Sequence, residues 1–162
     1  MDTTLLRDAY EQLAAAAGPA RFHSPAQAGP EWPVEMVVAH VVAATRALVL
    51  LGTQVLAGRQ ASHLGETLSA RPARLEANVR SVGSYAGLLV ALRQGAMELL
   101  ALADHFDQQA ANRTLSSGEG SVTFAELPRT HVTPHIKRHM QDISVLVGAA
   151  PNGSVSARPR VA

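Results

Sequence analysis

Two histidines, His135 and His139, stand four residues apart in a segment with helical periodicity. Because an α-helix has 3.6 residues per turn, both imidazoles project from the same face. Two nitrogen ligands on one rigid helix provide half of a transition-metal site. A third candidate, His40, falls on the inward stripe of another strongly apolar run that is predicted to be helical. We therefore hypothesise that the fold brings His40 against His135 and His139.

Three neutral imidazoles from two helices would leave a fourth coordination position open to water or substrate. A metal bound there lowers the pKa of a water ligand to about 7 and acts similarly on a thiol. The same residues also fit a simpler interpretation, in which His40 is a satisfied core histidine and His135 and His139 form a solvated face. Burying several unpartnered imidazoles is costly, which favours the metal. The residues alone leave both interpretations open.

The other candidates have weaker signals. Asp142 lies one turn beyond His139 and could accept a hydrogen bond from a ligand's free ring nitrogen, or it could be solvated. His131 could replace His135 if the helix register differs. Trp32 is expected to pack as a hydrophobic plug over the end of the bundle. The remaining candidates are predicted to be surface residues: His23, His63, His105, Asn78 and Arg80.

Composition restricts the class of protein. The 162 residues are 47% hydrophobic but only 4% aromatic, which suits one domain of closely packed helices. The formal net charge of +1, without a basic cluster, argues against nucleic acid as partner. No cysteine is present, so any thiol chemistry would use a thiol from outside.

The N-terminus lacks the pattern of a signal peptide. The apolar run from Met36 to Leu56 contains His40 and Arg46, which fit a buried helix of a soluble protein better than a membrane span. The protein is therefore predicted to be cytoplasmic, with no membrane partner.

Apolar residues recur at helical spacing, and glycines and prolines interrupt them. This pattern predicts an all-α four-helix bundle over residues 1–150 and a disordered tail over 151–162. The helices are expected at 2–17, capped by Asp2 or Thr3, at 33–56, at 72–106 with a break or a close helix contact near 83–87, and from 133 onward. The last of these would begin with Thr133 as cap and Pro134 in the first turn. His135 would then lie near the positive helix end, which disfavours a cation by about 1 kcal/mol or less. Residues 18–31, 58–71 and 107–132 are expected to be connections, with a short extended piece at 121–124.

Two segments resemble a known superfamily. The run from Trp32 to His40, WPVEMVVAH, is similar to the opening of the second helix in the DinB/YfiT-like superfamily. The pattern His135-x-x-x-His139-x-x-Asp142-Ile143 resembles its fourth-helix signature. The resemblance covers most of residues 2–148. It is greatest to the mycothiol-dependent maleylpyruvate isomerase N-terminal-domain-like branch, at Leu127-Pro128 and His139-x-x-Asp142.

The resemblance implies an up-down-down-up bundle, a divalent metal at His40, His135 and His139, and a homodimer. Zinc is the first choice of metal, with nickel, iron and manganese as alternatives. The branch also implies mycothiol or another low-molecular-weight thiol as cofactor. This chain departs from the branch in having His135 where a glutamate ligand is usual, and Val132, Thr133 and Pro134 where an arginine is usual.

The resulting prediction is a metal-dependent enzyme that uses a metal-activated thiol for S-transfer or isomerisation of a small electrophilic substrate. A metal-dependent hydrolase is one alternative. A second is a stress-related helical bundle that binds a metal or small ligand without turnover. A metal-free helical interaction protein is the third. The sequence identifies no catalytic residue and no substrate.

Overall fold

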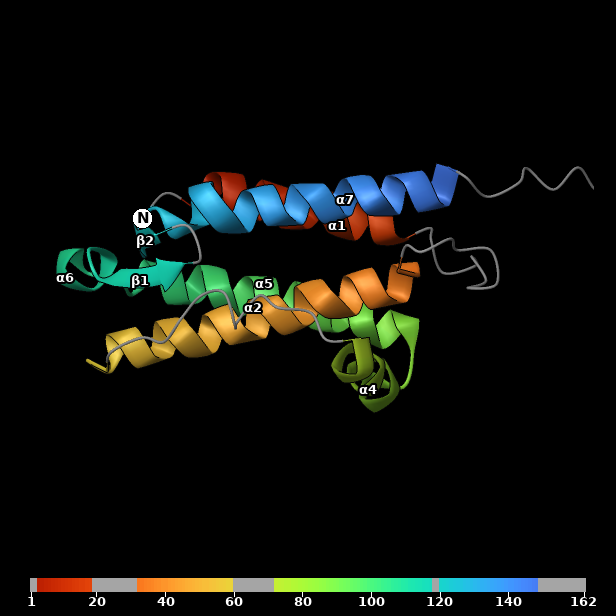
Figure 1. Ribbon diagram of the computed structural model, residues 1–162, viewed down its shortest axis with the longest axis horizontal. Helices are drawn as coiled ribbons and strands as arrows, with labels where there is room; N and C mark the ends of the chain where they lie inside the picture. Colours follow the sequence, from red (N-terminus) through yellow and green to blue (C-terminus); the bar gives the residue numbers. More distant parts are fainter. Residues whose placement is uncertain (1–2, 19–31, 60–71, 118–119, 149–162) are drawn as a thin grey trace, which may run out of the picture.

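The computed structural model describes residues 3–18, 32–59, 72–117 and 120–148. Its four long helices lie along one another in Figure 1: α1 (Thr4–Ala17), α2 (Val34–Leu56), α5 (Tyr85–Asp104) and α7 (Thr133–Gly148). The shorter elements are α4 (Pro72–Val82), α6 (Gln108–Ala111), β1 (Thr114–Ser117), β2 (Gly120–Thr123) and the π-helical turn η3 (Pro128–Val132). The predicted all-α class is confirmed, with a small hairpin as an addition.

The contacts between helices fix their directions. Tyr85 at the start of α5 donates its hydroxyl hydrogen bond to the carbonyl of Ala17 at the end of α1, over 2.7 Å. A Cβ atom on Gly95 would contact Thr45, and one on Gly52 would contact Leu102, so α2 and α5 run parallel. Figure 1 shows that α1 and α7 run together in the opposite direction to α2 and α5. This arrangement places the first half of α2 beside α7.

The core is aliphatic, as the composition predicts. Its largest fully buried side chains come from the four long helices, α4 and the hairpin: Leu6, Leu13, Leu75, Leu88, Leu92, Leu115, Ile136, Ile143, Val38, Val41 and Val55. Phe106 and Phe124 stack at the hairpin end, with ring centroids 5.0 Å apart. The small residues Gly52 and Gly95 allow α2 and α5 to approach closely, since a Cβ atom on Gly52 would lie 2.6 Å from Leu102 Cδ2.

A buried hydrogen-bond chain links α1 to α2. Thr45 Oγ1 donates to the carbonyl of Val41 over 2.7 Å, so the Tyr10 hydroxyl, 2.6 Å away, donates to Thr45. Burial raises the pKa of Tyr10 to about 12, and the hydrogen bond to Thr45 opposes this rise. The tyrosine therefore stays protonated throughout the neutral range.

Replacing Tyr10 with phenylalanine tests this chain. The change keeps the ring but leaves Thr45 Oγ1 without its donor, so the free energy of unfolding should fall by about 1 kcal/mol. Urea unfolding at neutral pH measures the change. Tyr85→Phe is a less buried comparison, and a Tyr10→Phe protein as stable as the unchanged one would contradict the assignment.

Of the two alternatives predicted near residues 83–87, a break or a close helix contact, the structure shows the break, between α4 and α5. The chain leaves α4 at Gly83, which has a φ of +76°, a conformation that favours glycine. Ser84 then caps α5, because its side chain accepts a hydrogen bond from the Gly87 amide over 3.0 Å. The helix that was expected to reach residue 106 ends at Asp104.

The region 107–132, expected to be a largely irregular connection, is more ordered than predicted. Asp107 caps the short helix α6, and β1 pairs antiparallel with β2, with Leu115 opposite Val122. The predicted extended piece corresponds to β2. Arg113 donates hydrogen bonds to the carbonyls of Val55 and Arg59, which joins the hairpin to the end of α2.

The predicted start of the last helix is wrong. Thr133 is not a cap, because η3 leads directly into α7 and Thr133 has helical angles, φ −60° and ψ −45°. Pro134 has no amide hydrogen, and its ring would clash with the carbonyl four residues earlier in a regular helix. The wider turn just before it, in which the Thr133 amide donates to the Pro128 carbonyl, accommodates that proline. His135 therefore lies in the first turn of α7, but this turn continues from η3 and is not a free helix start.

Several predictions concern residues outside the described part of the chain. These are the Asp2 cap, nearly all of the 18–31 and 58–71 connections, the domain end at residue 150 and the disordered tail 151–162. His23 and His63 lie in these stretches as well. Thr3 precedes α1 without a side-chain capping bond.

Within the part of the chain that the structure describes, two helices, α2 and α5, are long and apolar enough to cross a membrane by length and composition alone, with mean hydropathies of 1.9 and 1.4. In α2, 67% of the apolar window is buried, which is the behaviour of a core helix. In α5 the share is 28%, and Val90 and Met97 are exposed. The outer face of α5 is therefore more apolar than a solvent-facing helix requires.

Candidate metal centre

The fold brings His40, His135 and His139 together. The ring centroids of His40 lie 4.9 Å from those of His135 and His139, which are themselves 4.5 Å apart. One nitrogen from each ring falls within 4.8 Å of the other two. The predicted cluster of three imidazoles therefore exists, with one member on α2 and two on α7.

The local sequence explains this convergence. Ile136 and Ile143 bury one stripe of α7 in the core, which turns His135 and His139 toward α2. On α2, His40 is only 5% exposed and lies among fully buried aliphatic residues such as Val38 and Val41. A polar ring in this position needs a partner.

Burial keeps these histidines neutral. It lowers the pKa of His40 to about 4, with a smaller contribution from His139. Burial also lowers the pKa of His135 to about 4, helped by the charges of His139, His40 and Arg138. The pKa of His139 is lowered by burial too, although Asp142 opposes that shift. At neutral pH the three rings therefore carry lone pairs that can bind a metal.

One atom of the cluster tests whether a metal fits. Nε2 of His135 is buried and has no hydrogen-bond partner in the described part of the chain. A buried polar nitrogen without a partner costs about 1–3 kcal/mol. A divalent metal among three imidazoles would satisfy this atom, and three nitrogen ligands with an open fourth position are typical of catalytic zinc. The residues present fit such an ion.

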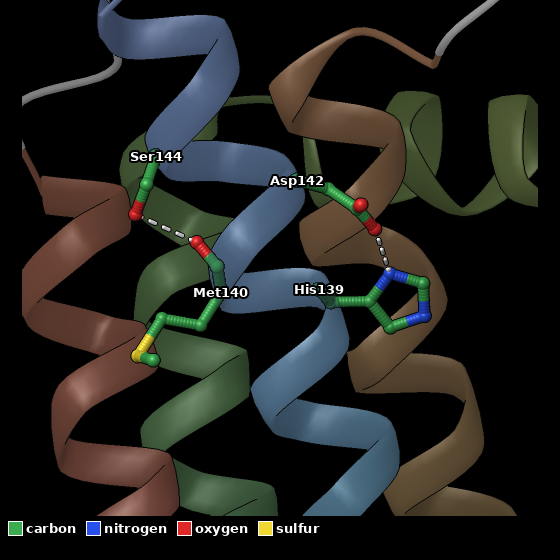
Figure 2. Close-up of polar contacts among 4 residues, drawn as sticks. All are labelled: His139, Met140, Asp142 and Ser144. Atoms are coloured by element: carbon green, nitrogen blue, oxygen red, sulfur yellow. Dashed lines mark hydrogen bonds and ion pairs between the residues drawn. The ribbon is translucent and has the colours of Figure 1, made fainter.

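Asp142 orients one of the rings. Its Oδ2 lies 3.0 Å from Nδ1 of His139. Figure 2 marks this contact with a dashed line. If Nδ1 carries the proton and donates it to this carboxylate, Nε2 keeps its lone pair for a metal, the arrangement that carboxylates commonly impose on metal-binding histidines. Of the two alternatives for Asp142, the structure favours the hydrogen-bonded one.

We expect Asp142→Ala to weaken metal binding by about 10- to 100-fold, because the His139 ring would lose its orientation and its fixed tautomer. Competition with a chromophoric chelator measures the affinity. Ser144→Ala is the matched control: Ser144 donates to the Met140 carbonyl on the same helix (Figure 2), away from the cluster. Equal losses in both variants would assign the effect to helix damage.

The structure separates the other candidates from this cluster. His131 lies in η3, where its Nδ1 is 2.8 Å from Thr130 Oγ1, so it does not replace His135. His105 is exposed beyond the end of α5. Arg80 is exposed and lies 4.0 Å from Glu76. Asn78, also on α4, is half-buried.

Trp32 lies closer to the site than the sequence indicated. Its ring meets the His40 ring edge-on, with centroids 5.6 Å apart. The tryptophan was expected to plug the end of the bundle, and it forms part of the apolar wall around His40 as well. Sequence reasoning also overlooked Arg138, whose signal was its position three residues after His135.

Two small cavities lie in the described core. A cavity of about 10 Å³ lies beneath His135, bordered by Tyr10 and Thr45. An apolar cavity of about 30 Å³ lies farther along the bundle, between Leu6, Gly52 and Phe124. Neither of these two cavities has room for a small organic molecule.

Comparison with known proteins supports the fold. No family model matches this chain, and no curated protein sequence matches it. Among solved structures, the mycothiol-dependent maleylpyruvate isomerase matches 86% of this chain with a TM-score of 0.66 at 16% identity. A histidine-to-alanine mutant of the mycothiol-dependent maleylpyruvate isomerase matches with the same TM-score at 15% identity.

The match covers 58% of each solved chain, so this chain spans little more than half of their length. At this level of identity the likeness shows a shared fold. It agrees with the branch that the motifs around His40 and His139 resemble.

Proposed function

We propose that this protein is a metal-dependent enzyme that uses a low-molecular-weight thiol, mycothiol or a similar one, for S-transfer or isomerisation of a small electrophilic substrate. The observation that carries the proposal is the cluster of three neutral imidazoles with the unpartnered Nε2 of His135. Its occurrence in a fold shared with mycothiol-dependent isomerases supports the choice of a thiol.

His40, His135 and His139 would hold the metal. Zinc is the first choice for three imidazoles, and nickel, iron and manganese are the alternatives. A divalent metal supplies Lewis acidity that lowers the pKa of a bound thiol, which produces a sulfur nucleophile at neutral pH. Because the ligands are all neutral, the site keeps the full charge of the ion and acts as a stronger Lewis acid than a site with a glutamate.

The chain's own residues have two tasks in this scheme. Asp142 holds the His139 ring. Trp32 and the aliphatic residues of α2 exclude water from His40. The absence of cysteine means that the chain supplies no competing thiolate, so the sulfur must come from the cofactor.

We further propose a cytoplasmic homodimer that acts on a small molecule and binds neither nucleic acid nor membrane. The net charge of +1 supports the absence of nucleic acid. The exposed Val90 and Met97 on α5 give a dimer one apolar surface to bury. Sedimentation of the purified protein tests the dimer, and a monomer at all concentrations would exclude it.

The deciding experiment has two steps. Elemental analysis of untagged protein, prepared without nickel columns or chelators, should find about one divalent metal per chain. Thermal unfolding is then followed with mycothiol, bacillithiol or glutathione, and the cofactor should raise Tm in the loaded protein only. Metal without any thiol effect would favour a hydrolase or a non-catalytic binder. If the protein contains no metal and cannot take it up, the proposal of a metal-dependent enzyme is excluded.

A further inference from the structure

The side of α5 that faces away from α2 carries exposed apolar side chains. Gly95 lies where α5 meets α2, since a Cβ atom on it would contact Thr45. Met97 is 70% exposed and lies about 200° round the helix from Gly95, because each residue turns an α-helix by about 100°. Val90, which is 60% exposed, and the half-buried Leu100 lie on the same side. An apolar helix side left open in this way is typical of an interaction surface.

Opposite charges stand at the two ends of this side. Four residues follow one another along α5 at spacings of four, three and four, which keeps them on one line, here called the outer stripe: Arg93, Met97, Leu100 and Asp104. Arg93 and Asp104 are both exposed, and neither forms an ion pair among residues 3–18, 32–59, 72–117 and 120–148. A stripe with a cation at one end, an anion at the other and apolar residues between them is complementary to a reversed copy of itself.

A second copy of the chain matches the outer stripe in one register. A two-fold axis makes the two α5 helices antiparallel, and every contact then occurs twice. With the axis midway between Met97 and Leu100, each Met97 lies opposite the partner's Leu100, and each Arg93 lies opposite the partner's Asp104. Moving the axis half a heptad towards the N-terminus would place Arg93 opposite the partner's Met97, where its charge has no counterpart. Charge complementarity therefore selects the first register.

We propose that a second copy of this chain docks antiparallel on the outer stripe of α5, and that Arg93 of each copy binds the partner's Asp104. The inference rests on the proposed homodimer, to which it assigns an interface and a register. An arginine can form two parallel hydrogen bonds with a carboxylate, which gives the register its specificity. Contacts between single helices lie at the lower end of the size range for specific interfaces, so the dimer should dissociate measurably on dilution.

The test exchanges the charges at the ends of the outer stripe. Sedimentation velocity over a range of concentrations gives the dissociation constant of the dimer for the unchanged protein, for Arg93→Asp, for Asp104→Arg and for the two changes combined. Glu98→Arg is the matched control, because Glu98 is an exposed acidic residue of α5 that lies about 120° round the helix from Asp104. Circular dichroism checks that every variant keeps its helices.

We expect each single change to weaken the dimer about tenfold or more, because symmetry then places two like-charged pairs in the interface. The combined change should restore the dissociation constant to within about threefold, since it recreates both ion pairs with the signs exchanged. Glu98→Arg should change it by no more than about twofold, because an exposed charge outside the stripe is screened by solvent.

The outcomes separate the interface from the homodimer. If the protein is a dimer and the single changes leave its dissociation constant unaltered, or the combined change fails to restore it, the inferred pairing is overturned and the homodimer stands. If the protein is a monomer at all concentrations, both are overturned. Flotation with phosphatidylcholine vesicles tests the other occupant: a monomer that binds them, and loses this binding in Met97→Lys, would assign the outer stripe to a membrane surface and overturn the inference.

Discussion

Replacing His139 with alanine is expected to abolish stoichiometric metal binding. Two imidazoles, His40 and His135, would remain on different helices, without the ring that Asp142 orients. Losing one of three coordinate bonds should weaken the affinity by about a hundredfold to just under a thousandfold, since structural zinc sites hold roughly 10–16 kcal/mol in four ligands. The metal content of the purified variant, after dialysis against a weak chelator, measures this loss.

His40→Ala and His135→Ala should behave in the same way, because the proposed site has no spare ligand. Matched controls are His131→Ala, one turn before His135, and His105→Ala, which is exposed beyond the end of α5. Both should keep about one metal per chain. Circular dichroism of the metal-free proteins shows whether each variant is folded. Normal metal content in a folded variant of any of the three predicted ligands would contradict the site.

Acid is expected to destabilise the metal-free protein well above the range where carboxylates titrate. The pKa of His40 and of His135 is about 4 in the folded protein, against an ordinary value of 6.5. Between these values the unfolded chain binds more protons, so the free energy of unfolding falls as the pH falls from 6.5 towards 4. The slope reaches about 1.4 kcal/mol per pH unit for each such histidine.

Urea unfolding with a chelator at pH 7, 6 and 5 measures this slope. Glu126 should not contribute to the slope of the free energy of unfolding between pH 7 and pH 5, because its hydrogen bonds to Thr123 hold the pKa of its carboxylate below the ordinary 4.5. His40→Leu removes one protonation site and should flatten the dependence. Bound metal should steepen it, since protons compete for the same nitrogen atoms. Stability that is constant from pH 7 to pH 5 would show that the histidines are not buried as described.

The helices were predictable where the apolar periodicity and the helix-breaking residues indicate the same boundaries. Pro33 and the long apolar stripe after it place α2 closely, and Gly83 marks the break between α4 and α5 because only its freedom at positive φ suits that turn. The convergence of His40 with His135 and His139 followed from their inward positions and from the resemblance of the flanking motifs. Their role as metal ligands stays a prediction.

Other structural features had no signal in the local sequence, or the local sequence indicated a different structure. Thr133-Pro134 has the composition of a helix start, yet η3 precedes it, because a π turn can accommodate an internal proline. The hairpin between residues 114 and 123 lacks a clear alternation of apolar and polar residues, and its strands are short. The edge-on contact between the Trp32 and His40 rings depends on tertiary packing, which the periodicity of the sequence does not describe.

The position of Trp32 gives this protein a built-in optical probe. It is the only tryptophan in the chain, and its ring meets His40 edge-on. Indole fluorescence is quenched by paramagnetic ions such as copper(II) or cobalt(II) at short range, whereas zinc has a filled d shell and leaves the emission to respond to packing alone. When the indole is excited selectively, at wavelengths that the two tyrosines do not absorb, occupancy and the class of ion can therefore be followed on the unlabelled protein from an emitter that lies beside a candidate ligand.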